Sequence, residues 1–163
     1  MKQEIFSVLD ARQTPRRGFL ALLGAGGVAL LGSALFPSRS FATVEETLKA
    51  IEGITGGIAP LEEKVSLELP QIAENGNTVP FTVRVESPMT KDDYVKAIHI
   101  LAEENPQPGV VTFHLNPRSG KARIKARMRL AKTQNVVAVA ETSGGGMFIA
   151  KRQIKVTIGG CGG

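Results

Sequence analysis

The sequence predicts an all-β fold: an immunoglobulin-like antiparallel β-sandwich of about seven strands, with a short N-terminal helix and a flexible C-terminal arm. Three observations lead to this prediction. Apolar and polar residues alternate from Lys64 onward, which is the period of a strand with one buried face. Clusters of Pro, Gly, Asn and Ser interrupt the alternation at short intervals. The last five residues are Gly-Gly-Cys-Gly-Gly, a composition that resists regular structure.

An export signal is predicted at the N-terminus. Arg16 and Arg17 form a paired-arginine element that resembles bacterial twin-arginine signals, which export folded proteins. An apolar run over 19–36 and a small-residue site before Thr43 follow in the expected order. The apolar run is long enough for a transmembrane anchor, but glycines dilute it and the cleavage-like site comes at once. We therefore expect residues 1–42 to be removed and the mature chain to be periplasmic.

The mature chain would have 121 residues, enough for one domain. It keeps 15 of the 20 basic and 13 of the 15 acidic residues, so its net charge is only +2. This small charge and the absence of tryptophan give no support to nucleic-acid binding. A single cysteine in an oxidising compartment cannot form an internal disulfide, so it either pairs with another molecule or acts as a reactive thiol.

A short helix and a connector are expected over 43–61. Thr43 and Glu46 have the spacing of a capping box. Val44, Leu48 and Ile51 follow at helical spacing and predict a narrow apolar stripe, and Gly53 is expected to end the helix.

A β-sandwich domain is expected over 62–158. Asn75-Gly76-Asn77 is expected to form a turn between the first two strands, and Gly144-Gly145-Gly146 a hairpin turn before the last. The predicted strands are 64–69, 81–86, 94–102, 110–115, 122–130, 136–141 and 147–158.

One predicted strand carries a row of cations. They alternate with apolar residues, so they share the outer face of that strand. We expect an ordinary solvated face whose charges are countered by a neighbouring strand. The alternative is a patch that attracts anions or an acidic partner. The cations are Lys121, Arg123, Lys125, Arg127 and Arg129.

The two histidines, His99 and His114, both fall in predicted strands. Neither has further ligands at metal-binding spacing, so no metal site is predicted. No nucleophile accompanies them at a recognisable spacing either, and we expect packing or surface roles. No catalytic residues are predicted.

Cys161 is the group to which we assign chemistry. It lies on an arm formed by Gly159, Gly160, Gly162 and Gly163, roughly 10 Å from Ile158 when the chain is extended. An unperturbed cysteine has a pKa of about 8.5, so most of the free thiol is protonated near neutral pH. We therefore expect a weak nucleophile that partner enzymes activate.

Four segments of the chain are distinctive: Val156–Gly163, Ile72–Gly76, Ser87–Thr90 and Arg127–Ala131. Together they resemble the SoxY family, the sulfur-carrier subunits of the periplasmic thiosulfate-oxidising Sox system. The resemblance covers essentially the whole mature chain, and the twin-arginine signal agrees with it.

The resemblance implies a non-catalytic carrier that holds sulfur intermediates covalently on Cys161, with no other cofactor. It implies a heterodimer with SoxZ. It also implies that the c-type haem enzyme SoxAX loads thiosulfate, that the dimanganese hydrolase SoxB releases sulfate, and that the dehydrogenase SoxCD, where present, oxidises the remaining sulfur. No membrane contact is expected after signal cleavage.

Two other functions fit parts of the sequence. A ubiquitin-like carrier would use the terminal carboxylate of Gly163 as a thiocarboxylate, but the export signal and the strand pattern oppose it. A non-catalytic interaction module would dimerise through a Cys161 disulfide.

Overall fold

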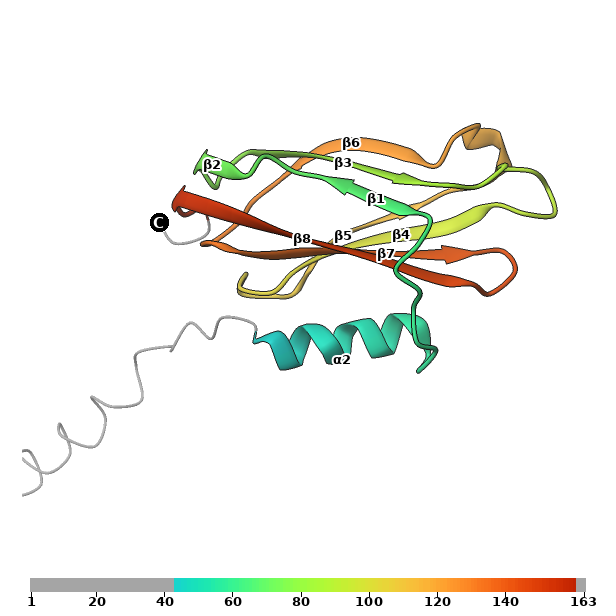
Figure 1. Ribbon diagram of the computed structural model, residues 1–163, viewed down its shortest axis with the longest axis horizontal. Helices are drawn as coiled ribbons and strands as arrows, with labels where there is room; N and C mark the ends of the chain where they lie inside the picture. Colours follow the sequence, from blue (N-terminus) through green and yellow to red (C-terminus); the bar gives the residue numbers. More distant parts are fainter. Residues whose placement is uncertain (1–42, 161–163) are drawn as a thin grey trace, which may run out of the picture. The chain divides into compact units, whose positions relative to one another are not determined.

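In the computed structural model, residues 43–160 are described, and they form two β-sheets and one α-helix (Figure 1). Residues 1–42 and 161–163 lie outside the described residues, and with them Arg16, Arg17 and Cys161. The elements are α2 (Val44–Thr55), β1 (Val65–Glu68), β2 (Ile72–Asn75), β3 (Val79–Val85), β4 (Val95–Ala102), β5 (Gly109–His114), the short 3-10 helix η1 (Pro117–Ser119), β6 (Arg123–Met128), β7 (Gln134–Thr142) and β8 (Met147–Ile158).

The strands form a sandwich of a three-stranded and a five-stranded sheet. The order is β1-β3-β6 in the first and β2-β8-β7-β4-β5 in the second. Helix α2 lies on the far side of the five-stranded sheet, so the three layers are sheet, sheet and helix (Figure 1). The predicted all-β sandwich with a short N-terminal helix is confirmed.

Strand β2 was not predicted, and it makes eight strands in place of seven. The turn at Asn75-Gly76-Asn77 exists, and the Asn77 amide donates to Asn75 Oδ1 at 2.9 Å. However, the turn follows β2, which crosses to the other sheet and pairs with β8 in parallel. The sandwich is therefore not purely antiparallel. Pro70, two residues beyond β1, lacks the donor that would continue the β1 ladder.

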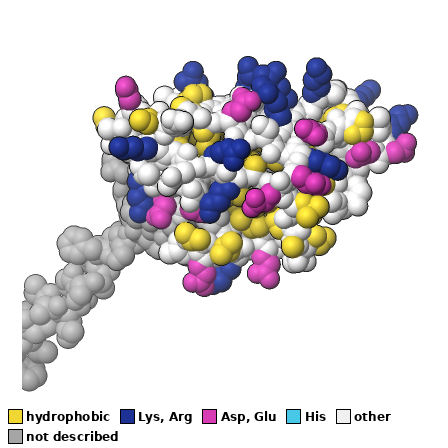
Figure 2. All heavy atoms as spheres, in the orientation of Figure 1, with side chains coloured by type: hydrophobic (Ala, Val, Ile, Leu, Met, Phe, Trp, Pro, Cys, Tyr) yellow, Lys and Arg dark blue, Asp and Glu magenta, His cyan; other side chains and the backbone are white. Residues whose placement is uncertain are grey.

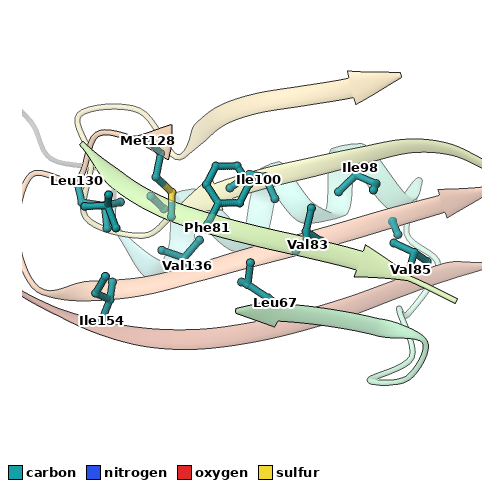
Figure 3. Packing of buried hydrophobic residues seen from close by; sticks show 14 of the residues in the cluster. Leu67, Phe81, Val83, Val85, Ile98, Ile100, Met128, Leu130, Val136 and Ile154 are labelled. Atoms are coloured by element: carbon teal, nitrogen blue, oxygen red, sulfur yellow. The ribbon is translucent and has the colours of Figure 1, made fainter. Parts of the chain in front are cut away.

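Alternating side chains of the two sheets fill the space between them. In β3, Phe81 and Val83 are buried, and they meet Ile98 and Ile100 of β4 across the sandwich (Figure 3). The rings of Phe81 and Phe113, from opposite sheets, lie 6.5 Å apart between centroids. Full burial of one such side chain stabilises a fold by about 1.5–3 kcal/mol, so the predicted period-two patterns determine which faces meet.

The N-terminal helix is capped as predicted. The Glu46 amide donates to Thr43 Oγ1 at 3.3 Å, and the Thr43 amide donates to Glu46 Oε2 at 3.2 Å. Two expectations for this helix are wrong. It continues through Gly53 to Thr55. Gly56 caps its C-terminal end with a left-handed backbone, at a φ of 63° that favours glycine.

The predicted apolar stripe of the helix is the second expectation, and it is wrong in part. Ile51 packs against the sheet residues around Leu101, as predicted, but Val44 and Leu48 are 48% and 60% exposed. Thr47 and Ile54 share the packed face with Ile51 instead. No helix within residues 43–160 is long and apolar enough to cross a membrane.

Candidate functional site

Strand β8 carries the chain to Gly159 and Gly160, directly before Cys161. Ile154 and Val156 are buried and fix this strand. Ile158, the last residue of the strand, has a side chain that is 65% exposed. Cys161, Gly162 and Gly163 lie outside the described residues, so the site visible here is the base from which the cysteine-bearing segment starts.

Three backbone hydrogen bonds hold the end of β8 against two other segments of the chain. The Gly76 amide donates to the Ile158 carbonyl at 2.7 Å, the Leu130 amide to the Gly76 carbonyl at 2.8 Å, and the Gly160 amide to the Leu130 carbonyl at 2.9 Å. We call Gly76, Leu130, Ile158 and Gly160 the glycine clasp. It joins the β2–β3 turn, the β6–β7 loop and the end of β8, which are far apart in sequence.

The clasp has no room for side chains at its glycines. A Cβ on Gly76 would lie 2.3 Å from the Leu130 carbonyl oxygen, and one on Gly160 would lie 2.4 Å from the Gly76 carbonyl. A Cβ on Gly159 would lie 2.0 Å from the Ala131 oxygen. Sequence reasoning assigned Gly159 and Gly160 to flexibility alone. Close backbone packing is a second and independent reason for glycine at both positions. The flexibility of the arm stays a prediction.

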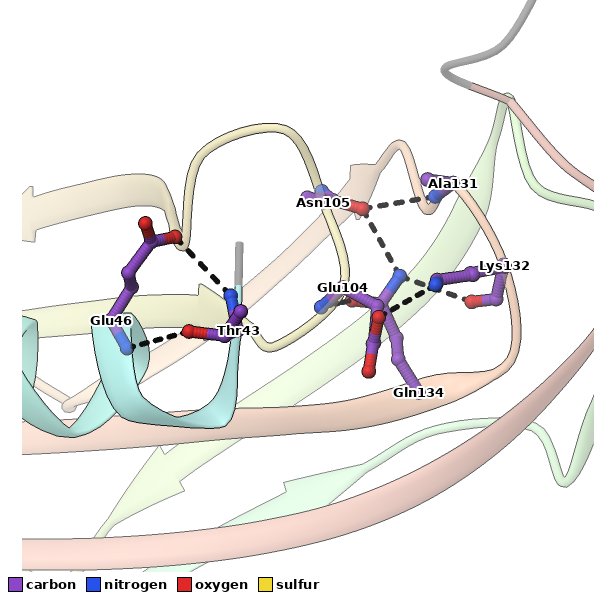
Figure 4. A network of polar contacts seen from close by, with 7 residues as sticks. All are labelled: Thr43, Glu46, Glu104, Asn105, Ala131, Lys132 and Gln134. Atoms are coloured by element: carbon purple, nitrogen blue, oxygen red, sulfur yellow. Dashed lines mark hydrogen bonds and ion pairs between the residues drawn. The ribbon is translucent and has the colours of Figure 1, made fainter. Parts of the chain in front are cut away.

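Asn105 holds the β6–β7 loop on which the clasp depends (Figure 4). Its side chain is buried and donates from Nδ2 to the Arg129 carbonyl at 2.9 Å. Its Oδ1 accepts from the Ala131 amide at 2.9 Å and from Gln134 Nε2 at 3.0 Å. One amide group therefore fixes the chain on both sides of Leu130.

Gln134 extends this network. Its Nε2 also donates to the Lys132 carbonyl at 3.0 Å, and its Oε1 accepts from the Glu104 amide at 2.8 Å. The Lys132 ammonium pairs with the Glu104 carboxylate at 2.7 Å (Figure 4). Buried polar groups that are all paired specify one geometry, because any displacement leaves a group unpaired at low dielectric.

Sequence reasoning placed Asn105 and the Lys132–Asn135 segment in turns and assigned them no role. Nothing in the local sequence separates a buried asparagine from the many exposed ones in Pro- and Gly-containing turns. The residues of the clasp are not neighbours in sequence, so no local pattern predicts that they meet. Only the position of Gly76 in a turn was predicted.

His99 and His114 lie in or at the end of β4 and β5, as the predicted strands placed them. His99 Nδ1 lies 3.0 Å from Thr112 Oγ1 on the neighbouring strand. Burial lowers the pKa of His99, nearby Glu141 raises it and His114 lowers it further, with a net decrease from 6.5. Within residues 43–160 there is no group of three or more His, Cys, Asp or Glu side chains that could hold a metal ion.

Fold and site together define a class: a small β-sandwich protein whose final strand is clasped by glycine backbone one residue before a cysteine near the C-terminus. The chain belongs to the SoxY family, because the family model for sulfur oxidation protein SoxY matches residues 51–161. The match thus includes the clasp and Cys161.

Solved structures agree with this assignment. The sulfur carrier protein SoxY from Chlorobium limicola f thiosulfatophilum is 35% identical, with a TM-score of 0.56, over 66% of this chain and 89% of that chain. A superoxide reductase (neelaredoxin) from Ignicoccus hospitalis is 17% identical, with a TM-score of 0.52, over 58% of this chain and 80% of that chain, and it shares the fold alone. No curated protein sequence matches the chain.

Proposed function

We propose that this protein is a periplasmic sulfur carrier in thiosulfate oxidation and holds its intermediates covalently on Cys161. One observation carries the proposal: the single cysteine of the chain directly follows the glycine clasp and ends the segment that matches the SoxY family. The 35% identical structure is itself described as a sulfur carrier.

The proposed chemistry is a cycle on one sulfur atom. The Cys161 thiolate joins the outer sulfur of thiosulfate, and the two electrons released pass to the haem enzyme SoxAX. This gives a cysteine S-thiosulfonate. The hydrolase SoxB then adds water to release sulfate and two protons, which leaves a cysteine persulfide. SoxCD, where present, removes six electrons from the outer sulfur and adds three oxygen atoms from water, which gives a cysteine S-sulfonate. A final hydrolysis releases this group as sulfate and restores the thiol.

In this scheme the carrier supplies position rather than catalysis. Covalent attachment keeps the sulfur at high local concentration for each enzyme in turn. While the Gly160 amide is bonded to the Leu130 carbonyl, Cys161 is one residue beyond that bond, a span of about 3.5 Å. Release of that bond frees the chain from Ile158 onward and extends the reach to roughly 10 Å.

Export and partner choice complete the proposal. Cleavage before Thr43 would release a periplasmic protein, with Arg16 and Arg17 as the twin-arginine element. SoxZ is the proposed heterodimer partner. If the measured mass of the mature protein does not correspond to a chain that starts near Thr43, the export route is contradicted and the carrier chemistry is unaffected.

The test is intact-mass and peptide-mass analysis of the protein purified with its partner, after exposure to thiosulfate and SoxAX. We expect an added thiosulfonate on the Cys161 peptide and none on the Cys161→Ser variant. Sulfur on the Gly163 carboxylate with Cys161 free would instead establish the thiocarboxylate carrier. Thiosulfate-dependent respiration that survives Cys161→Ser would overturn the carrier function.

A further inference from the structure

The cationic face of β6 has no countercharges from its neighbour β3. Arg123 lies opposite Arg84, which pairs with Glu68 of β1 at 3.0 Å. Lys125 lies opposite Thr82. For the three cations of β6, the expected exposure is confirmed, but the expected countercharges are absent from the paired positions of β3. Like charges directly opposite each other destabilise a sheet, so the pair Arg84 and Arg123 is a local cost of the fold.

The remaining cation of β6, Arg127, lies opposite Pro80 and donates to the Thr78 hydroxyl at 3.2 Å. Lys and Arg side chains gather along the upper margin of the molecule, over β6 and β3 (Figure 2). The result is a row of exposed cations on one strand, set by the alternation that the sequence predicted.

The same strand has a free backbone edge. The Val85 amide donates to the Ala122 carbonyl, which makes 85 and 122 a hydrogen-bonded pair of the β3–β6 register. Residues 124, 126 and 128 then bond toward β3, and the backbone groups of Lys125 and Arg127 point away from it. In the described part of the chain β6 pairs with β3 alone.

An apolar groove lies beside this edge. Strand β5 is the edge of the five-stranded sheet, and the groove of about 550 Å³ lies between it and β6. Val111 and Phe113 of β5 line it on one side, and Ala126 and Met128 of β6 on the other. A strand added to β6 would present alternate side chains to this groove and to the cationic face.

We propose that the β6 edge binds an extended protein segment in which acidic and apolar residues alternate, as an added strand of the three-stranded sheet. The main chain would pair with Lys125 and Arg127, the apolar side chains would enter the groove, and the acidic ones would meet the cations. A second copy of β6 is a poor occupant, because it would bring the same cations against these. This surface is independent of the chemistry of Cys161.

A competing explanation is that the cations only protect an exposed edge from aggregation, since natural proteins blunt such edges with charge. The two explanations differ in what charge reversal does. Edge protection predicts no affinity for an acidic strand and self-association once the cations are neutralised. Strand addition predicts affinity that depends on both the charge and the alternation of the added segment.

The test uses the protein purified from its own cells and a fluorescein-labelled peptide that alternates Glu and Val over 6 residues, the length of β6. Binding is measured by fluorescence anisotropy at low and high salt. We expect Lys125→Glu with Arg127→Glu to weaken binding by about tenfold or more. The matched control, Arg152→Glu with Lys155→Glu at two exposed cations of β8, should change it by less than about twofold.

Hydrogen exchange supplies the second measurement. The bound alternating peptide should slow exchange at the Lys125 and Arg127 amides, and a peptide of the same composition with Glu and Val in separate blocks should not. Equal binding of both peptides, or an equal loss in the β8 control, would mean long-range charge attraction and overturn the proposal. Absence of binding together with self-association of Lys125→Gln/Arg127→Gln would establish edge protection instead.

Discussion

The β6 edge ends at Met128, two residues before Leu130 of the glycine clasp, yet the edge and the clasp are built in opposite ways. In the clasp every backbone group named above has a partner, and the glycines leave no space for a side chain. Along β6 two backbone positions face outward and like charges stand opposite each other. The backbone hydrogen bonds of the clasp are all made within the chain. The outward-facing backbone groups of β6 have no partner strand among the described residues.

This difference distinguishes two kinds of constraint. In the clasp, a single added methyl group meets backbone atoms that cannot move without breaking hydrogen bonds, so substitutions should cost stability. At the edge, the cations oppose the fold slightly, so their removal should increase stability. Substitutions at the two places should therefore have effects of opposite sign.

The largest expected effect is that of Gly76→Ala. The new Cβ would lie 2.3 Å from the Leu130 oxygen, and we expect a loss of about 3 kcal/mol, the upper end for overpacked sites. Urea unfolding measures it. Gly53→Ala is the matched control: nothing lies within 4 Å of its Cβ, so this helical site should gain about 0.5–1 kcal/mol. Equal effects at both positions would contradict the close packing of the clasp.

The next effect is that of Asn105→Ala, which removes three hydrogen bonds and leaves the Arg129 carbonyl and the Ala131 amide without that partner. We expect a loss of about 2 kcal/mol in urea unfolding. Maleimide labelling of Cys161 should also become faster, because the loop that binds Gly160 loosens. The exposed Asn77→Ala should stay within about 0.5 kcal/mol. Unchanged labelling with lowered stability would limit Asn105 to a structural role.

A smaller effect, of opposite sign, is expected at the edge. Arg123→Thr removes the charge opposite Arg84 and should increase the free energy of unfolding by about 0.5 kcal/mol at low salt. The gain should shrink as salt screens the exposed charges. Lys155→Thr, an exposed cation opposite Ile72, is the control and should show no such gain. Destabilisation by Arg123→Thr at every salt concentration would mean that the cation contributes to the fold.

The smallest effect concerns pH. Because burial lowers the pKa of His99 below 6.5, the unfolded state takes up its proton first as the pH falls. The stability that neutral His99 provides is therefore complete above pH 6.5 and decreases as the pH falls through the lowered pKa. Urea midpoints above and below pH 6.5 should differ less in His99→Gln than in the parent protein. An unchanged difference would assign the pH dependence to groups other than His99.

Much of the fold could be predicted from the sequence. Burial on one face of a strand imposes a period of two, and this pattern together with the turn residues predicts β1 and β3 to β8, although β4 and β7 are buried on both faces. The Thr43 capping box was equally visible, because its partners are three residues apart. Strand β2 was missed because Ile72–Asn75 is short and mostly exposed, and its partner β8 lies about eighty residues further along the chain.

The candidate site, like the fold, could be predicted from the sequence only in part. The sequence by itself determined that one cysteine stands among four terminal glycines, and the motifs around it indicated the family that the comparison then established. Only the tertiary structure decided that Gly76 and Gly160 meet at Leu130, that Asn105 is buried beneath them, and that β6 has no countercharge beside it. Local patterns record interactions between near neighbours, whereas these contacts depend on strand order and register, which are fixed only when the two sheets pack together.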